Sequence, residues 1–256
     1  MHGHGKMSWY DSKNSQTKNT YKGDMFANVI QGYGVLTKSN GDSYEGEFEN
    51  ALFNGEGTYM WSNPRLKFKG QFRNGLIHGY GVLHNLHGVY EGEFRKGLMH
   101  GKGMITFYNG DKYSGEFLDS TLTGYGCYTL LDGTKVIGHF DDGMCNRHAK
   151  KLYPDGRVYI GEFRDDVENG KGLLIDGKKE IKGIWRNAIL VEELVSENVN
   201  YENSMALGQY EKLGDQREEK PTEVIKPQEI NPPQVLGKKQ LDEYTPNSKT
   251  EEHEEL

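Results

Sequence analysis

Apolar and polar residues alternate in short runs along most of the chain. In the run Tyr90–Phe94, aromatic residues and a glycine hold the odd places while two glutamates hold the even ones. Because successive side chains of a strand point to opposite faces, this run predicts a strand with one aromatic and one acidic face. A second run, Lys102–Tyr108, ends at Asn109-Gly110, a pair typical of two-residue hairpin turns. Together the two runs predict a pair of antiparallel strands.

The same pair of runs recurs every twenty-two to twenty-four residues, so the chain is a repeat array. The copies begin at Tyr21, Tyr44, Phe68, Tyr90, Tyr113, Val136, Tyr159 and Ile181. Most copies carry a Gly-x-Gly pair at the twelfth and fourteenth places and a large apolar residue at the sixteenth, namely Leu36, Tyr59, Leu83, Ile105, Tyr128 and Leu174. Glycine in a strand leaves bare backbone over which an aromatic ring can lie. We therefore expect the rings and these apolar residues to form the core.

The pattern predicts an all-β fold, an elongated antiparallel meander of stacked β-hairpins. At about 4.8 Å between strands and two strands per repeat, the array would be roughly 70 Å long. Residues 1–20 are interpreted as a partial repeat and an insertion, and residues 21–187 as about seven full repeats plus a partial eighth. The sixth copy has Arg147 and Ala149 in place of the paired glycines, so a bend or irregularity is expected there. Further two-residue turns are expected at Asn40-Gly41, Asp132-Gly133, Asp155-Gly156 and Asp176-Gly177.

The spacing resembles the MORN repeat (membrane occupation and recognition nexus), usually written YxGxFxxGxxxGxG. In the copy that begins at Tyr90, the matching residues are Tyr90, Gly92, Phe94, Gly101 and Gly103. The resemblance extends over roughly residues 1–187. It implies a kinship with stand-alone arrays of cilia and flagella, including radial-spoke heads, and of cytoskeletal assemblies. Some members carry an appended lysine methyltransferase or phosphoinositide kinase domain, for which the residues after this array are too few.

The repeat pattern stops after Arg186. Apolar residues between Ile189 and Val195 predict a short amphipathic helix over residues 188–200, which would cap the last hairpin. Residues 201–256 hold five of the seven prolines and few aromatic residues, and are predicted to be an acidic disordered tail. Counted from Glu192, this end has sixteen acidic and seven basic residues, a net charge of −9, against −7 for the whole chain. It is either a solubilising extension or a segment that folds on contact with a partner.

Composition and motifs exclude several classes of protein. No apolar run approaches the roughly twenty residues that cross a bilayer, and the first residues lack the apolar core of a signal peptide. Cys127 and Cys145 are too few for a secreted disulfide framework, so we expect a cytoplasmic protein. His78 and His100 occupy the same place in successive repeats, about 10 Å apart, which is too far to share a zinc ion. We expect no enzyme activity, no cofactor and no metal site.

Two functions are compatible with such an array. The first is a non-catalytic protein-interaction scaffold of a ciliary, axonemal or other cytoskeletal complex, whose face receives a helix or another MORN array. Its candidate partner-binding residues are Tyr44, Phe48, Phe72, Tyr90, Phe94, Tyr113, Phe117, Glu47, Glu93, Glu116 and Glu162. The alternative is a peripheral membrane or phosphoinositide-binding adaptor, with Lys150, Lys151, Lys178 and Lys179 as candidates. Membrane contact is expected to be secondary because the array is nearly neutral, and the acidic balance argues against nucleic acid.

Overall fold

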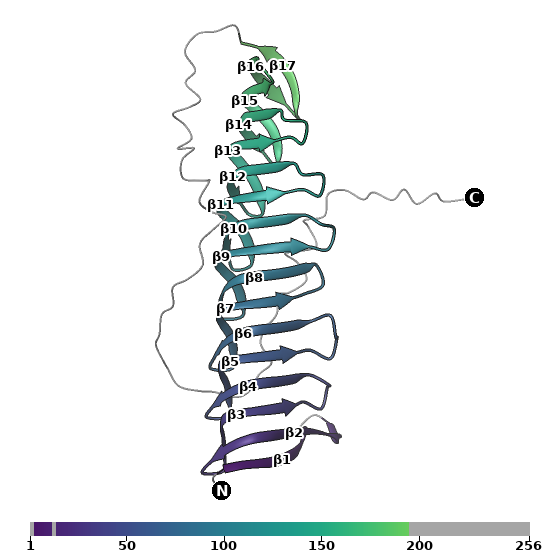
Figure 1. The fold of residues 1–256 in the computed structure, drawn as a ribbon, viewed down its shortest axis with the longest axis vertical. Coiled ribbons are helices and arrows are strands. Elements are labelled where there is room, and N and C mark those ends of the chain that lie inside the picture. Colours follow the sequence, from purple (N-terminus) through teal and green to yellow (C-terminus); the bar gives the residue numbers. More distant parts are fainter. Residues whose placement is uncertain (1–2, 12–13, 195–256) are drawn as a thin grey trace, which may run out of the picture.

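The computed structural model describes residues 3–11 and 14–194, which form a single antiparallel sheet of seventeen strands. Each strand pairs with its neighbours in sequence, so the hairpins stack along one long axis from β1 to β17 (Figure 1). The predicted all-β, elongated meander is confirmed. The strands are β1 Gly3–Asp11, β2 Asn14–Phe26, β3 Val29–Thr37, β4 Ser43–Glu49, β5 Leu52–Met60, β6 Lys67–Arg73, β7 Leu76–His84, β8 Gly88–Arg95, β9 Leu98–Phe107, β10 Lys112–Leu118, β11 Thr121–Thr129, β12 Lys135–Asp141, β13 Met144–Leu152, β14 Val158–Arg164, β15 Val167–Asp176, β16 Lys179–Arg186 and β17 Ile189–Glu193.

The tightest turns lie within the repeats and not at the Asn-Gly pairs. In the fourth repeat, Lys96 and Gly97 join β8 to β9 with φ of 53° and 86°, the geometry of a two-residue turn. In the seventh repeat the same geometry is formed by Asp165 and Asp166, with φ of 50° and 67°. Several of these turns contain no glycine, so the usual sequence signal of such a turn is absent from them.

The Asn-Gly and Asp-Gly pairs instead form longer loops between repeats. Phe107 N–H donates to the Asp111 carbonyl at 2.9 Å, which leaves three residues inside the loop around Asn109-Gly110. The same hydrogen bond closes the loops at Asn40-Gly41, Asp132-Gly133 and Asp155-Gly156, so the prediction of two-residue turns there is wrong. Near Asp176-Gly177, a two-residue turn is present, formed by Gly177 and Lys178. In the four longer loops glycine alone has a positive φ and is the last of the three loop residues, the usual geometry of a three-residue connection.

The aromatic rings on the first strand of each repeat fill one face of the sheet, which we call the inner face. Tyr90 is 0% exposed, and its ring meets Phe94 at 5.0 Å and Phe117 of the next repeat at 4.9 Å between centroids, both edge to face. A Cβ placed on Gly92 or Gly103 would overlap the Tyr90 ring, so the ring lies on bare backbone as predicted. Repetition of these contacts gives one continuous core along the array.

Both ends of the array differ from the prediction. Ile189–Glu193 form strand β17, which pairs with β16, so the predicted helix is wrong for these residues. Residues 195–200 of that helix and the tail predicted over 201–256 lie outside the described residues. At the other end, β2 begins at Asn14, so most of the insertion expected at the end of residues 1–20 belongs to a strand that pairs with β1. In both places, pairing with a neighbouring strand continues the meander beyond the repeat pattern.

Candidate interaction surface

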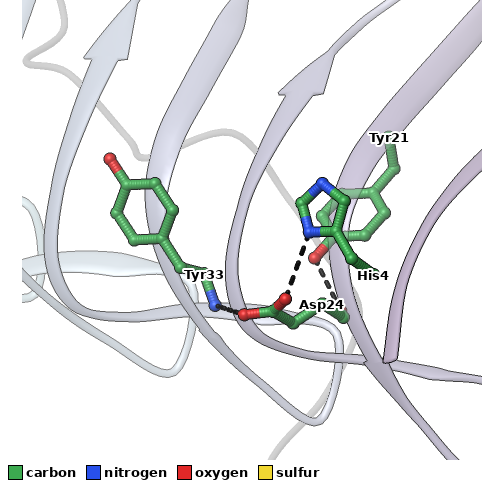
Figure 2. Close-up of polar contacts among 4 residues, drawn as sticks. All are labelled: His4, Tyr21, Asp24 and Tyr33. Carbon is green, nitrogen blue, oxygen red and sulfur yellow. Dashed lines mark hydrogen bonds and ion pairs between the residues drawn. The ribbon is translucent and has the colours of Figure 1, made fainter. Parts of the chain in front are cut away.

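The acidic residue at the fourth place of a repeat holds a bend in its own hairpin. In the first repeat, Asp24 Oδ2 accepts a hydrogen bond from Tyr33 N–H at 3.1 Å, and Tyr21 Oη donates to the Asp24 carbonyl at 2.7 Å (Figure 2). His4 Nδ1 lies 3.2 Å from Asp24 Oδ1. The hydrogen bonds from His4 and from Tyr33 N–H lower the pKa of Asp24. The carboxylate therefore compensates backbone groups that the sheet ladder leaves unpaired at the bend.

The fourth repeat shows why the bend needs these residues. Gly92 pairs with Gly103 and Phe94 pairs with Met99, so the second strand bulges opposite Glu93. Tyr90 Oη donates to the Glu93 carbonyl at 2.9 Å, and Glu93 Oε1 accepts from Lys102 N–H at 3.2 Å. The same hydroxyl-to-carbonyl bond recurs in the repeats that begin at Tyr44, Tyr113 and Tyr159. Tyrosine at the first place thus supplies a donor that phenylalanine lacks.

The predicted acidic row, Glu47, Glu93, Glu116 and Glu162, is therefore built into the bends. Glu47 Oε1 accepts from Glu56 N–H at 3.1 Å, as Glu93 does from its own second strand. The Glu116 and Glu162 carboxylates lie against Gly124 and Gly170, the residues that turn the second strand with φ of 57° and 111°. The sixth repeat, where an irregularity is expected, has His139 and Arg147 at these two places, and Arg147 takes a φ of 71°. These glutamates shape the hairpins, and binding by them stays a prediction.

Replacing the bend glycine of one repeat is expected to destabilise the fold. Gly101 has a φ of 63°, which a β-branched residue rarely adopts. Gly101→Val should therefore lower the free energy of unfolding by about 1–3 kcal/mol. Urea unfolding followed by circular dichroism measures this change. Lys102→Val, at the next and exposed position, is the matched control and should stay near wild type; equal effects of the two variants would refute the role of the bend.

The seven aromatic residues predicted to bind partners are in the core and not on the surface. Tyr90 and Tyr113 are 0% exposed, and the most exposed of the seven, Phe72 and Phe94, reach only 3%. Tyr44, Phe48 and Phe117 are equally enclosed. A partner cannot touch them while the sheet is intact, so they act only by holding the fold. The alternation of residues along a strand assigns the rings to one face of the sheet. The bend in each hairpin then encloses that face, so the rings are buried although there is only one sheet.

The four candidate lysines do not form one cluster. Lys150 and Lys151 are adjacent in β13, so their side chains lie on opposite faces of the sheet. Lys151 Nζ forms an ion pair at 2.7 Å with Glu168, whose side chain is 3% exposed, and is therefore not available to a lipid. Lys178 and Lys179 are exposed at the turn between β15 and β16. Lys150, Lys178 and Lys179 remain as candidates for contact with an anionic surface.

The outer face, opposite the rings, carries an apolar surface that the sequence analysis did not identify. Six partly exposed residues lie side by side on β12–β15, and we call them the outer patch: Ile137, Leu152, Val158, Ile160, Leu173 and Ile175. Lys150 lies among them, paired with Ile137 on one side and Ile160 on the other. The equivalent row over β4–β8 alternates charged and uncharged residues, among them Glu45, Lys69 and Glu91. The outer face thus changes character along the array.

The described residues offer little for other kinds of site. Within residues 3–11 and 14–194, no three histidine, cysteine, aspartate or glutamate side chains are placed to hold a metal ion. The same residues contain no helix that is long and apolar enough to cross a membrane. The candidate binding surfaces of this part of the chain are therefore the two faces of its sheet.

The family model of the MORN repeat matches this chain at residues 1–13, 21–43, 44–63, 68–84, 90–112, 113–135, 137–156 and 159–178. The chain belongs to the MORN repeat family. The matched residues cover the first and second strands of most hairpins, in agreement with the sheet. The MORN repeat itself is a non-enzymatic unit, and its presence suggests a repeat protein that binds proteins or membranes.

Comparison with solved structures adds only a distant likeness. The MORN array is similar to the SAS-4 (dCPAP) TCP domain of Drosophila melanogaster, solved in complex with a proline-rich motif of Ana2 (dSTIL), with 13% sequence identity and a TM-score of 0.36. The likeness covers 62% of this chain and 90% of that domain. No curated protein matched the sequence.

Proposed function

We propose that this MORN protein is a non-catalytic interaction scaffold that binds a partner protein through its outer patch. The observation that carries the proposal is the row of partly exposed apolar side chains on β12–β15, on a sheet whose inner face is already filled by its own rings. A contiguous apolar surface on a rigid support is typical of a protein-binding site. Lys150 within the patch favours a partner with acidic as well as apolar side chains.

The proposed setting is a cytoskeletal assembly, such as the axoneme of a cilium or flagellum, including a radial spoke. This setting is suggested by the resemblance to stand-alone arrays of the family in cilia, flagella and cytoskeletal assemblies. An elongated sheet of seventeen strands suits a structural role because it presents one surface along its whole length. The partner would be a helix or a second MORN array of the same assembly, in the cytoplasm or the cilium.

A matched pair of variants tests this function. The tagged full-length protein is purified from its source cells, and the proteins that accompany it are identified by mass spectrometry. Ile160→Lys places a charge in the outer patch, whereas Val82→Lys places one in the same outward row on β7. We expect Ile160→Lys to lose the specific partners and Val82→Lys to keep them, with both variants melting near wild type. Identical partner sets for the two variants would refute the outer patch as the docking surface.

Membrane contact is the second candidate function, because Lys150 lies among apolar residues and Lys178 and Lys179 are exposed at the turn between β15 and β16. We expect weak sedimentation with phosphoinositide vesicles, lost at physiological salt, because screening weakens attraction between exposed charges. The triple change of these three lysines to glutamate should abolish the weak binding. Lys151 stays unchanged because it stabilises the core. Tight vesicle binding that resists salt but disappears in the triple variant would favour the membrane function over the scaffold.

A further inference from the structure

The outer patch is basic as well as apolar. Lys150 lies inside it, and Lys135, Lys171 and Lys182 lie on the outer face of the same region, β12–β16. Two acidic residues share this face: Glu180, which pairs with Ile175, and Glu162, whose carboxylate lies against Gly170 at the bend. Over β4–β8 the equivalent row carries Glu45 and Glu91 with Lys69 between them. This row over β12–β16 holds Lys150 and Lys182 among apolar residues, so an acidic and apolar occupant is favoured there more than over β4–β8.

The chain itself contains a segment with this chemistry. Residues 195–211 hold Glu197, Glu202 and Glu211 and no lysine or arginine. Large apolar residues are interleaved with these glutamates: Val195, Val199, Tyr201, Met205, Leu207 and Tyr210. Residues 212–256 hold eleven acidic but also seven basic residues, and their large apolar residues are sparser. The segment therefore complements the outer patch in both charge and polarity.

The segment also begins close to the patch. Leu194 N–H donates to the Lys182 carbonyl at 2.8 Å, so the described part of the chain ends beside β16. Strand β15 is the next strand, and β12 is three strands further, a distance of about 20 Å from β16 at 4.8 Å per strand. Seventeen residues can extend to about 55–60 Å. The segment is thus long enough to reach across the whole patch. Its covalent attachment at Leu194 keeps it at a high effective concentration there.

We propose that residues 195–211 of this chain bind in cis to the outer patch. The acidic residues of the segment complement the lysines of this face, and its large apolar residues complement the apolar side chains of the outer patch. The inference rests on the proposed function in one respect, namely that a partner protein uses the same patch. A bound partner then has to displace the segment, which makes docking competitive and dependent on the acidic charge of the segment.

Cys127 gives a direct test in the full-length protein. It is a partly exposed residue of the outer face and pairs with Ile137 at the edge of the patch, whereas Cys145 is 0% exposed and burial raises its pKa to about 12. A nitroxide reagent should therefore label Cys127 and spare Cys145. We expect the amide signals of residues 195–211 to lose most of their intensity in the labelled protein and to recover it when the label is reduced. Signals of residues 230–256 should be affected much less.

Two controls distinguish a specific contact from random approach. Lys150→Glu should restore the signals of residues 195–211, whereas Lys69→Glu, in the same outward row on β6, should not. A label at Val35→Cys in a Cys127→Ser background should leave the segment unaffected, because Val35 lies on β3. A uniform loss of signal intensity along residues 195–256 would overturn the proposal. So would a loss that appears only when nitroxide-labelled molecules are mixed with separate isotope-labelled molecules, since the segment would then bind a second copy of the chain.

The two proposals fail in different ways. The nitroxide experiment contains no partner, so it reports the cis contact alone. If the segment contacts the patch but Ile160→Lys keeps every partner, the proposed function fails and the cis contact stands. If the segment is unaffected while Ile160→Lys loses its partners, the function stands and the inference about the segment falls.

Discussion

Tyr90→Ala is expected to lower the free energy of unfolding by about 3–5 kcal/mol. The side chain is 0% exposed, lies over two glycines of its own hairpin and contacts Phe117 of the next repeat. Its removal leaves a cavity that the surrounding backbone cannot fill, because the glycines have no side chains to move into it. Urea unfolding followed by circular dichroism measures the change.

The contributions of the Tyr90 hydroxyl and of the Tyr90 ring to stability can be measured separately. Tyr90→Phe keeps the ring but leaves the Glu93 carbonyl without its donor, and this should cost about 1–3 kcal/mol. Tyr108→Ala, at a ring that is 60% exposed, is the control and should stay within about 0.5 kcal/mol of wild type. Unchanged stability of Tyr90→Ala together with loss of a partner would instead make Tyr90 a binding residue.

Glu168→Ala is expected to destabilise the fold by a similar amount, about 3–5 kcal/mol, because it leaves the largely enclosed Lys151 ammonium without its partner. Glu168 is 2% exposed and occupies the tenth place of its repeat, where the other full repeats have an apolar or cysteine side chain. Lys151 Nζ lies 2.7 Å from Glu168 Oε1, and Tyr153 Oη donates to the same oxygen. The double change Lys151→Met and Glu168→Leu should recover most of the stability, since apolar replacements of a buried pair are often neutral.

The ion pair also predicts a dependence of stability on pH. Burial opposes ionisation of Glu168, but the hydrogen bonds from Lys151 and Tyr153 outweigh it, so its pKa in the folded protein is lower than usual. A carboxyl group with a lowered folded-state pKa contributes stability above its unfolded value of about 4.3 and loses it as the pH falls through the folded value. Urea unfolding from neutral to acid pH should show this loss. The loss should be smaller in the double variant; the same acid dependence in both proteins would show that other groups cause it.

The period-two alternation and the repeat length determined the fold class by themselves. Strand residues have a fixed alternation of faces, so Tyr90 and Phe94 could be assigned to one face and Glu91 and Glu93 to the other without coordinates. Their recurrence determined the order of pairing, because neighbouring hairpins are joined by short connections. The glycines under the rings followed from the same pattern.

Only the tertiary structure decided which of these faces a partner can reach. The bulge opposite Glu93 and the positive φ of Gly101 bend each hairpin, and this bend encloses rings such as Phe94 that a flat sheet would expose. Ile189–Glu193 carry apolar residues at a spacing that also fits a helix, but pairing with β16 satisfies their backbone and makes them a strand. The outer patch likewise arises from residues far apart in sequence, such as Ile137 and Leu173, which cross-strand register brings together. Alternation is a local property of the chain, whereas enclosure, edge pairing and surface patches depend on contacts between strands.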